Sequence, residues 1–269
     1  MSSTPLPHAI REMIGGLVHG RYAGYRLARA AIQARYYRSV FGLLWEFAEP
    51  IVFALVFTLL HQSRALSAGE FDAPYALFVL AGMMMWKTFI QSLVQSLQSM
   101  NKLSNLAGGV RLKPESAILS VLYENAFTLG FRVAILLVVV GWYGMLSPTG
   151  LALFFIALPL VPLSGMAIGL LLAPFNLVYR DVGHAVELAS WPWMFMSGAV
   201  VVLPAEGPMA LLRTWNPAAV VVYNLRSLLL FGTLDNVIAF TIVAGATFGT
   251  GLAAWYVYHV TFDMAGDMQ

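Results

Sequence analysis

Residues 35–60 read RYYRSVFGLLWEFAEPIVFALVFTLL and indicate how this chain meets a membrane. A basic, aromatic run leads through a corner that holds Glu46, Glu49 and Pro50 into a long apolar segment. This order is typical of a chain that lies along the cytoplasmic membrane face and then turns inward to cross the bilayer. A charge at the centre of a membrane helix costs about 2.5–3.5 kcal/mol, so both glutamates need a partner, water or a cavity.

The composition of the whole chain also indicates an integral membrane protein. Of its 269 residues, 59% are hydrophobic and 10% are charged, and its mean hydropathy is +0.76. Soluble domains carry about 25% charged residues. The net charge of +2 is too small to predict a nucleic-acid partner, and a chain without cysteine has no disulfide, thiol nucleophile or cysteine-ligated metal.

Apolar stretches of about 20 residues predict an all-α integral membrane protein, in which residues 1–269 form a single transmembrane domain with six spans. The predicted spans are 41–62, 75–97, 117–143, 151–178, 186–203 and 237–258. Residues 204–233 are apolar as well, but charged and helix-breaking residues such as Arg213 and Pro217 interrupt them. We expect re-entrant periplasmic helices here, because non-helical backbone at membrane depth must be buried in protein or face a water-filled cavity.

The distribution of lysine and arginine predicts the orientation in the membrane. Six arginines precede the first span, three basic residues lie in the second connection, and Arg180 lies in the fourth. The opposite side carries only Arg64, Arg213 and Arg226. The positive-inside rule therefore predicts a multi-pass protein of the bacterial inner membrane with both termini in the cytoplasm.

Residues 21–38 predict an N-terminal interfacial amphipathic helix. Five arginines alternate there with tyrosines and aliphatic residues. In such a helix the arginines meet anionic lipid headgroups or a negatively charged partner, while the apolar face lies in the membrane interface. The alternative is that this segment acts only as a topological anchor.

Three polar residues lie within the third span. Glu124, Thr128 and Arg132 are spaced four residues apart, so they share one face of the helix. Glu124 and Arg132 are separated by about 12 Å along the axis, which is too far for a direct ion pair. Each needs another partner, and Glu46 or Glu49 suits Arg132. A structural ion pair between helices is slightly favoured over contact with a substrate.

Aromatic residues gather in two of the spans. Trp191 and Trp193 lie in the fifth span, and Trp45 lies at the start of the first. Aromatic faces can stack on sugar rings, but aromatic residues also form belts at membrane interfaces. From residue type alone the belt interpretation is favoured.

The chain carries no recognisable catalytic motif. It has no G-x-x-x-x-G-K-[ST] phosphate-binding loop, no H-E-x-x-H and no G-x-S-x-G. Asp181, His184 and Glu187 are its one cluster of acidic and histidine residues, and the adjacent Arg180 makes them a poor metal site. We expect no catalytic residue, metal or cofactor in this chain, so ATP-driven work would fall to another polypeptide.

Four blocks of sequence, in order, resemble one family of membrane proteins. They are RYYRSVFGLLWEFAEP at 35–50, PYALFVLAGMMMWKTF at 74–89, NLVYRDVGH at 176–184 and WNPAAVVVYNLRSLLLFG at 215–232. Through them the chain resembles ABC-2-type permeases of the branch that exports capsule, O-antigen and teichoic acid polysaccharides, most of all a capsular export permease. The resemblance implies a homodimer of six-span subunits with two copies of a separate subunit, which binds ATP and Mg.

The resemblance also implies roles for individual residues. It places residues 98–116 at the coupling region that meets the ATPase, and the block from Asn216 to Arg226 at the exit of the conduit. The candidates for contact with the ATPase are Lys102, Arg111, Lys113, Arg180 and Asp181. The candidates for the conduit or its cytoplasmic mouth are Arg35, Arg38, Trp45, Glu46, Glu49, Arg132, Trp191, Trp193, Tyr223 and Arg226.

The implied substrate is an anionic polysaccharide on a lipid anchor that moves from the cytoplasm across the inner membrane. The short C-terminus favours capsule over O-antigen, and capsule export would add periplasm-spanning and outer-membrane partners. Three alternatives stay open. They are an exporter of a small drug or lipid from the same superfamily, a membrane-embedded transferase acting on polyprenyl-linked sugars, and an ion-coupled transporter.

Overall fold

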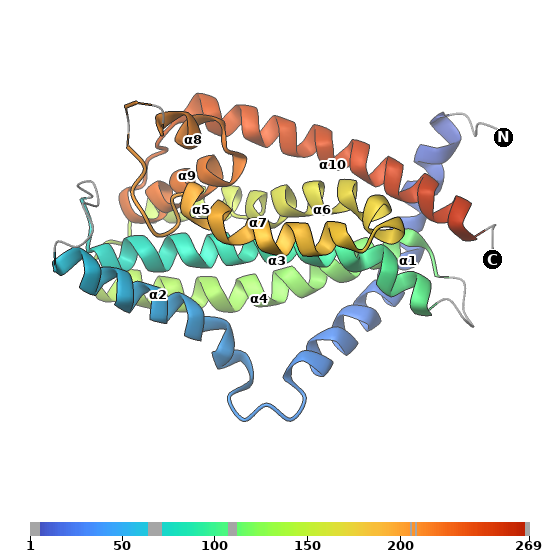
Figure 1. The fold of residues 1–269 in the computed structure, drawn as a ribbon, viewed down its shortest axis with the longest axis horizontal. Coiled ribbons are helices and arrows are strands. Elements are labelled where there is room, and N and C mark those ends of the chain that lie inside the picture. The colour runs from blue at the N-terminus through green and yellow to red at the C-terminus, as the bar shows by residue number, and fades with distance from the viewer. Residues whose placement is uncertain (1–5, 64–71, 107–111, 205, 208, 267–269) are drawn as a thin grey trace.

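The structure is a computed structural model that describes residues 6–63, 72–106, 112–204, 206–207 and 209–266. Within these residues the regular elements are all helices, as expected (Figure 1). In chain order they are α1 (Leu6–Tyr36), the 3-10 helix η1 (Gly42–Leu44), α2 (Trp45–Gln62), α3 (Tyr75–Leu106), α4 (Pro114–Trp142), α5 (Pro148–Ala157), α6 (Leu160–Val178), α7 (Asp181–Met196), α8 (Ala210–Trp215), α9 (Pro217–Phe231) and α10 (Val237–Gly266).

Five helical segments of the described chain are long and apolar enough to cross a membrane. They are Gly42–Gln62, Tyr75–Ser104, Pro114–Trp142, Pro148–Val178 and Val237–Phe262. They correspond to the first four predicted spans and to the last one. α3 continues to Leu106, past its predicted end at residue 97. The prediction stopped too early because it counted apolar residues, and the last turns of the helix are polar.

The fourth of these segments consists of two helices in succession. Leu158 and Pro159 separate α5 from α6, and proline removes one backbone donor from the helical ladder. At the start of α5 the Ser147 hydroxyl accepts a hydrogen bond from the Gly150 amide and caps the helix. The break therefore interrupts the helical backbone hydrogen bonds locally, while the apolar segment remains continuous.

The fifth predicted span, 186–203, is only partly helical. α7 is 16 residues long and ends at Met196. Gly198 follows with a φ of 67°, the left-handed conformation that commonly ends a helix. The residues from there to Leu203 are not helical, and an apolar pattern alone cannot distinguish such a buried segment from a helix.

Side chains from α3 and α9 satisfy the backbone of this non-helical segment. The Tyr75 hydroxyl donates to the carbonyl of residue 200 at 2.7 Å, and Arg226 donates to the carbonyl of residue 198 at 2.8 Å. The Tyr223 hydroxyl accepts from the amide of residue 203 at 2.6 Å. Residues 197–200 are buried, and buried backbone groups without partners are costly, so these bonds allow the chain to leave the helix inside the protein.

Residues 204–233 contain the expected pair of short helices, α8 and α9. The Asn216 side chain accepts a hydrogen bond from the Ala218 amide, and Pro217 occupies the first turn of α9. α9 ends at Gly232, which has a left-handed φ of 74°. The pair lies at the end of the bundle opposite both termini (Figure 1).

α1 is longer than the interfacial helix predicted at 21–38, and it packs against α4. Gly16, Gly20 and Gly24 are buried at a spacing of four residues, and each lies against the first turns of α4 near Glu115, Ser116 or Leu119. Small residues at this spacing allow close approach of helices. α1 therefore crosses the end of the bundle that holds both termini (Figure 1).

α3 is the central helix of the bundle. It contacts α2, α4, α6, α7 and α9, and most of its apolar stretch is buried. Gly165 and Gly169 on α6 lie directly against the α3 backbone near Phe89 and Leu93. α3 thus holds the other helices in place around one polar region, at the corner between α1 and α2.

Candidate functional site

The corner between α1 and α2 is a tight elbow. α1 ends at Tyr36, and Arg38 then takes a positive φ of 60° before η1 and α2 begin. Positive φ is uncommon for a residue with a side chain and marks a sharp change in direction. The two helices diverge from this elbow as a V whose tip projects away from α3 and α4 (Figure 1). Side chains on both sides of the elbow reach back to these helices.

An ion pair connects α2 to α4 at the elbow. Arg132 Nη2 donates to Glu46 Oε2 at 2.5 Å, and the exposed fraction of the Arg132 side chain is 1%. Arg132 also donates to Thr88 Oγ1 at 2.9 Å and to Gln91 Oε1 on α3. The prediction that Arg132 pairs with Glu46 or Glu49 is therefore confirmed, and the partner is Glu46.

A second ion pair connects α1 to α4. Arg35 Nη2 donates to Glu124 Oε2 at 3.2 Å. Gln95 Nε2 donates to the same Glu124 oxygen at 3.1 Å, and Asn125 donates to Gln95 Oε1 at 2.8 Å. As the spacing along α4 predicted, Glu124 and Arg132 find separate partners. The partner of Glu124, Arg35, precedes the elbow, and the partner of Arg132, Glu46, follows it.

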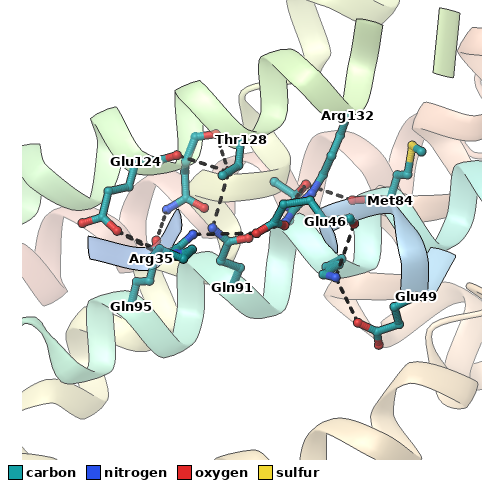
Figure 2. A network of polar contacts seen from close by, with 12 residues as sticks. Arg35, Glu46, Glu49, Met84, Gln91, Gln95, Glu124, Thr128 and Arg132 are labelled. Carbon is teal, nitrogen blue, oxygen red and sulfur yellow. Dashed lines mark hydrogen bonds and ion pairs between the residues drawn. The ribbon is translucent and has the colours of Figure 1, made fainter. Parts of the chain in front are cut away.

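Lys87 adds a third pair and extends the network along α3. Its Nζ lies 3.0 Å from Glu49 Oε2 and donates to the Glu46 carbonyl at 3.4 Å. Figure 2 shows the contacts running from Glu124 to Glu49 through side chains of α1, α2, α3 and α4. Three basic and three acidic side chains take part in these pairs, so their formal charges cancel.

Tyr36 fixes the orientation of Glu46 from α1. Its hydroxyl donates to Glu46 Oε1 at 3.1 Å. Burial and the nearby Glu46 carboxylate raise the pKa of Tyr36 above its ordinary value. The hydroxyl therefore keeps its proton and remains a donor at neutral pH.

Beside this network lies a polar hollow, which we call the elbow hollow. Its volume is about 410 Å³. Side chains that line it include Arg35, Glu46, Glu49, Lys87, Gln91 and Gln95. The network thus forms one wall of a space that a ligand can reach, because Arg35 and Glu49 are partly exposed.

Three other predicted conduit residues are exposed. Trp45 is 61% exposed, and its ring lies edge-on to Phe41 at 5.8 Å. Arg38 is exposed and lies over the Tyr37 ring at 5.4 Å. Trp191 on α7 is 58% exposed. The geometry leaves all three available to lipid, a partner or a substrate.

Three predicted conduit residues lie on or beside α9, toward the end of the bundle opposite both termini, and make internal contacts. Trp193 is half-buried, and its Nε1 donates to Asn216 Oδ1 at 3.0 Å. Arg226 is buried, and its guanidinium lies 3.6 Å from the centre of the Phe78 ring. Tyr223 is buried beside it. In this structure these side chains hold α7, α9 and the non-helical segment together.

The candidates for ATPase contact lie at the end of the bundle that holds the termini. Lys102, Lys113, Arg180 and Asp181 are all exposed, at the ends of α3, α4, α6 and α7 on that side (Figure 1). Arg111 lies outside the described residues. Among the residues described, no three His, Cys, Asp or Glu side chains are grouped as a metal ion would require.

Sequence reasoning did not identify the part of the network that α3 contributes. Lys87, Gln91 and Gln95 recur at four-residue spacing in a predicted span, so they share one helix face. That spacing is the signal that could have revealed a polar face on α3. It was hidden because the amides are uncharged and the surrounding segment is strongly apolar.

Comparisons with known proteins agree with this architecture. The model of the ABC-2 type transporter family matches residues 25–230. Over 195 residues the chain is 26% identical to the O-antigen export system permease protein RfbA of Myxococcus xanthus, covering 71% of this chain and 74% of that protein. Two proteins of the same name from Klebsiella pneumoniae are 25% and 24% identical over 218 residues, covering 76% of this chain and 78% of theirs. Since the family model covers most of its length, the chain belongs to the ABC-2 type transporter family.

Proposed function

We propose that this chain is the membrane subunit of an ATP-driven exporter that moves a lipid-linked polysaccharide out of the cytoplasm. The observation that carries the proposal is the charge-neutral network that fixes the elbow against α3 and α4 beside a polar hollow. The relatives reported above are named O-antigen export permeases. Their names suggest a hydroxyl-rich polymer, and a polar hollow at a membrane corner suits such a ligand.

The proposed assembly is a homodimer with two copies of a separate ATP-binding subunit. The cluster of exposed charged residues at the end of the bundle that holds both termini supports the contact with the ATP-binding subunit. Lys102 and Lys113 flank the connection between α3 and α4, and Arg180 and Asp181 form the turn between α6 and α7. These two turns would meet the ATP-binding subunit, where ATP and Mg would bind.

The proposed topology has six spans, with both termini in the cytoplasm and α8 and α9 as re-entrant helices. Five spans are the long apolar segments. The sixth would be α7 continued by the non-helical residues up to Leu203. The exposed basic residues at the end that holds the termini support this orientation under the positive-inside rule.

Whether the polymer is capsule or O-antigen is the finer part of the proposal. The sequence favoured capsule, whereas the relatives carry O-antigen in their names. We therefore propose a surface polysaccharide of either class. A capsule exporter would also associate with periplasm-spanning and outer-membrane proteins, and co-purification of such proteins would distinguish the two.

Export of a small drug or lipid is the second candidate function. A largely apolar hollow of about 530 Å³ lies between α6, α10, the end of α8 and the start of α9, lined by Ala167, Ile242, Val243 and Trp215 among others. Its size and lining would suit a small amphiphile or an acyl chain. This candidate predicts that small amphiphiles, rather than a glycolipid, stimulate ATP hydrolysis.

The test is to purify the chain together with a candidate ATP-binding subunit from the host. ATP hydrolysis is then measured with and without the lipid-linked polysaccharide extracted from the host. We expect a stable two-plus-two complex whose hydrolysis responds to the glycolipid. A complex that responds only to small amphiphiles would favour the second candidate, and failure to bind any ATP-binding subunit would overturn both.

A further inference from the structure

α3 carries a polar stripe along one face. Lys87, Gln91, Gln95, Gln98 and Lys102 are spaced three or four residues apart, so they fall within about 80° of arc and extend over about 22 Å of helix. That length is a large part of the roughly 30 Å hydrocarbon core. Polar side chains at such depth need protein partners or water, so the stripe must face one or the other along its whole length.

The stripe changes character along its length. Gln91 and Gln95 are held by Arg132, Glu124 and Asn125 within the network described above. By contrast, within the described part of the chain Gln98 makes no side-chain hydrogen bond and Lys102 forms no ion pair. In the half of the stripe nearer the termini, the Gln98 amide and the exposed Lys102 ammonium, which also interacts with Glu124, can therefore bind a ligand.

Gln98 lies where two hollows meet. It lines the elbow hollow together with Lys102. It also lines a second hollow of about 430 Å³ between α3, α6 and α7, together with Asn101, Asn176 and Arg180. The two hollows share Gln98, and we call them together the polar trough. Arg35, Lys87 and Lys102 are the lysine and arginine residues that line the first hollow, and Arg180 lines the second.

The chemistry of this trough fits one class of ligand. A primary amide both donates and accepts hydrogen bonds, as do the hydroxyl groups of a sugar. Lys102 and Arg180 can pair with the carboxylate or phosphate of an acidic sugar. We propose that Gln98, between Lys102 and Arg180, binds the sugar chain of the substrate where it leaves the cytoplasm. The proposal rests on the polysaccharide function above and assigns the first contact of the glycan.

The side chain of Gln98 can be tested in the assembled complex. The measurement is the concentration of host lipid-linked polysaccharide that gives half-maximal stimulation of ATP hydrolysis. Gln98→Leu removes both hydrogen-bonding groups, and we expect a roughly 3- to 10-fold rise, the effect of losing one or two neutral hydrogen bonds. Gln33→Leu is the matched control, because Gln33 is exposed on α1 and does not line the trough. Equal concentrations for Gln98→Leu and the unmodified protein would overturn the proposal.

A labelling experiment gives a second readout that does not depend on Gln98→Leu folding. The chain has no cysteine, so Gln98→Cys and Gln33→Cys each offer a single thiol to a water-soluble maleimide. We expect Gln98→Cys to react, and saturating glycolipid to slow that reaction at least about 3-fold without affecting Gln33→Cys. A thiol at 98 that is unreactive, or that glycolipid does not protect, would overturn the assignment. If glycolipid stimulates the unmodified complex but does not protect position 98, only this inference fails; if it does not stimulate at all, the polysaccharide function fails as well.

Discussion

Arg132 carries a charge that is almost completely removed from solvent, and Glu46 compensates it. Removal of one partner from a buried ion pair leaves the other uncompensated, which costs about 3–5 kcal/mol. We therefore expect Glu46→Gln to lower the free energy of unfolding by about 3 kcal/mol, measured by denaturant titration in mixed micelles. Glu49→Gln is the control, because its partner Lys87 is partly exposed and such pairs contribute about 1 kcal/mol or less. Equal losses for the two variants would contradict the assignment of Arg132 to Glu46.

Gly198 is the residue on which the end of α7 depends. Its φ of 67° disfavours any residue with a Cβ, and a Cβ there would overlap the Tyr223 ring. Gly144 has a similar φ of 69° but open space around it. We expect Gly144→Ala to cost about 1 kcal/mol for the left-handed conformation and Gly198→Ala about 3 kcal/mol because overpacking is added. Thermal unfolding of the purified variants measures both, and a smaller loss for Gly198→Ala would refute the packing argument.

Individual contacts at the site were predictable only where the spacing lay within one helix. Four-residue spacing placed Glu124 and Arg132 on one face and excluded a direct pair between them. The two glutamates at the corner were reasonable partners for Arg132, although the spacing did not choose between them. The pairing of Arg35 with Glu124 could not be predicted, because it depends on how α1 docks and no rule of spacing connects two separate helices.

The docking of α1 on α4 rests on a row of glycines. A Cβ on Gly24 would lie 2.7 Å from Leu119 Cβ and 3.0 Å from the Ser116 carbonyl oxygen, whereas one on Gly15 would meet nothing within 4 Å. Both changes to alanine favour the helix by up to about 1 kcal/mol. We expect Gly15→Ala to stabilise the protein and Gly24→Ala to destabilise it by about 1–3 kcal/mol. Unfolding in detergent compares the two, and a stabilising Gly24→Ala would show that α1 does not pack closely on α4.

Most elements could be predicted, and the exceptions have physical reasons. Long apolar runs predicted α2, α3, α4, α10 and the segment that α5 and α6 share. The non-helical residues after α7 could not be predicted, because their backbone partners are side chains from distant helices. The start of α1 at Leu6 could not be predicted, because glycine has a low helix propensity. The packing of these glycines on α4, which favours the helix, is not visible in the sequence.

The orientation of the whole molecule can be tested with single cysteines, because the chain has none of its own. Ser63 and Thr233 are exposed at the end opposite the termini, and Lys113 and Asp181 at the end that holds them. In spheroplasts we expect an impermeant maleimide to label Ser63→Cys and Thr233→Cys at once. Lys113→Cys and Asp181→Cys should react only after the membrane is permeabilised, and the reverse pattern would contradict cytoplasmic termini.

The central claim is that the molecule moves a lipid-linked polysaccharide outward, and the most direct measurement is where that polymer accumulates when the chain is absent. The gene is deleted in the host, and glycolipid is quantified on the cell surface and in the cytoplasmic fraction. The account predicts that surface polymer is lost and that the same lipid-linked polymer accumulates inside, with both restored by the unmodified chain. Unchanged surface polysaccharide in the deletion strain would contradict it.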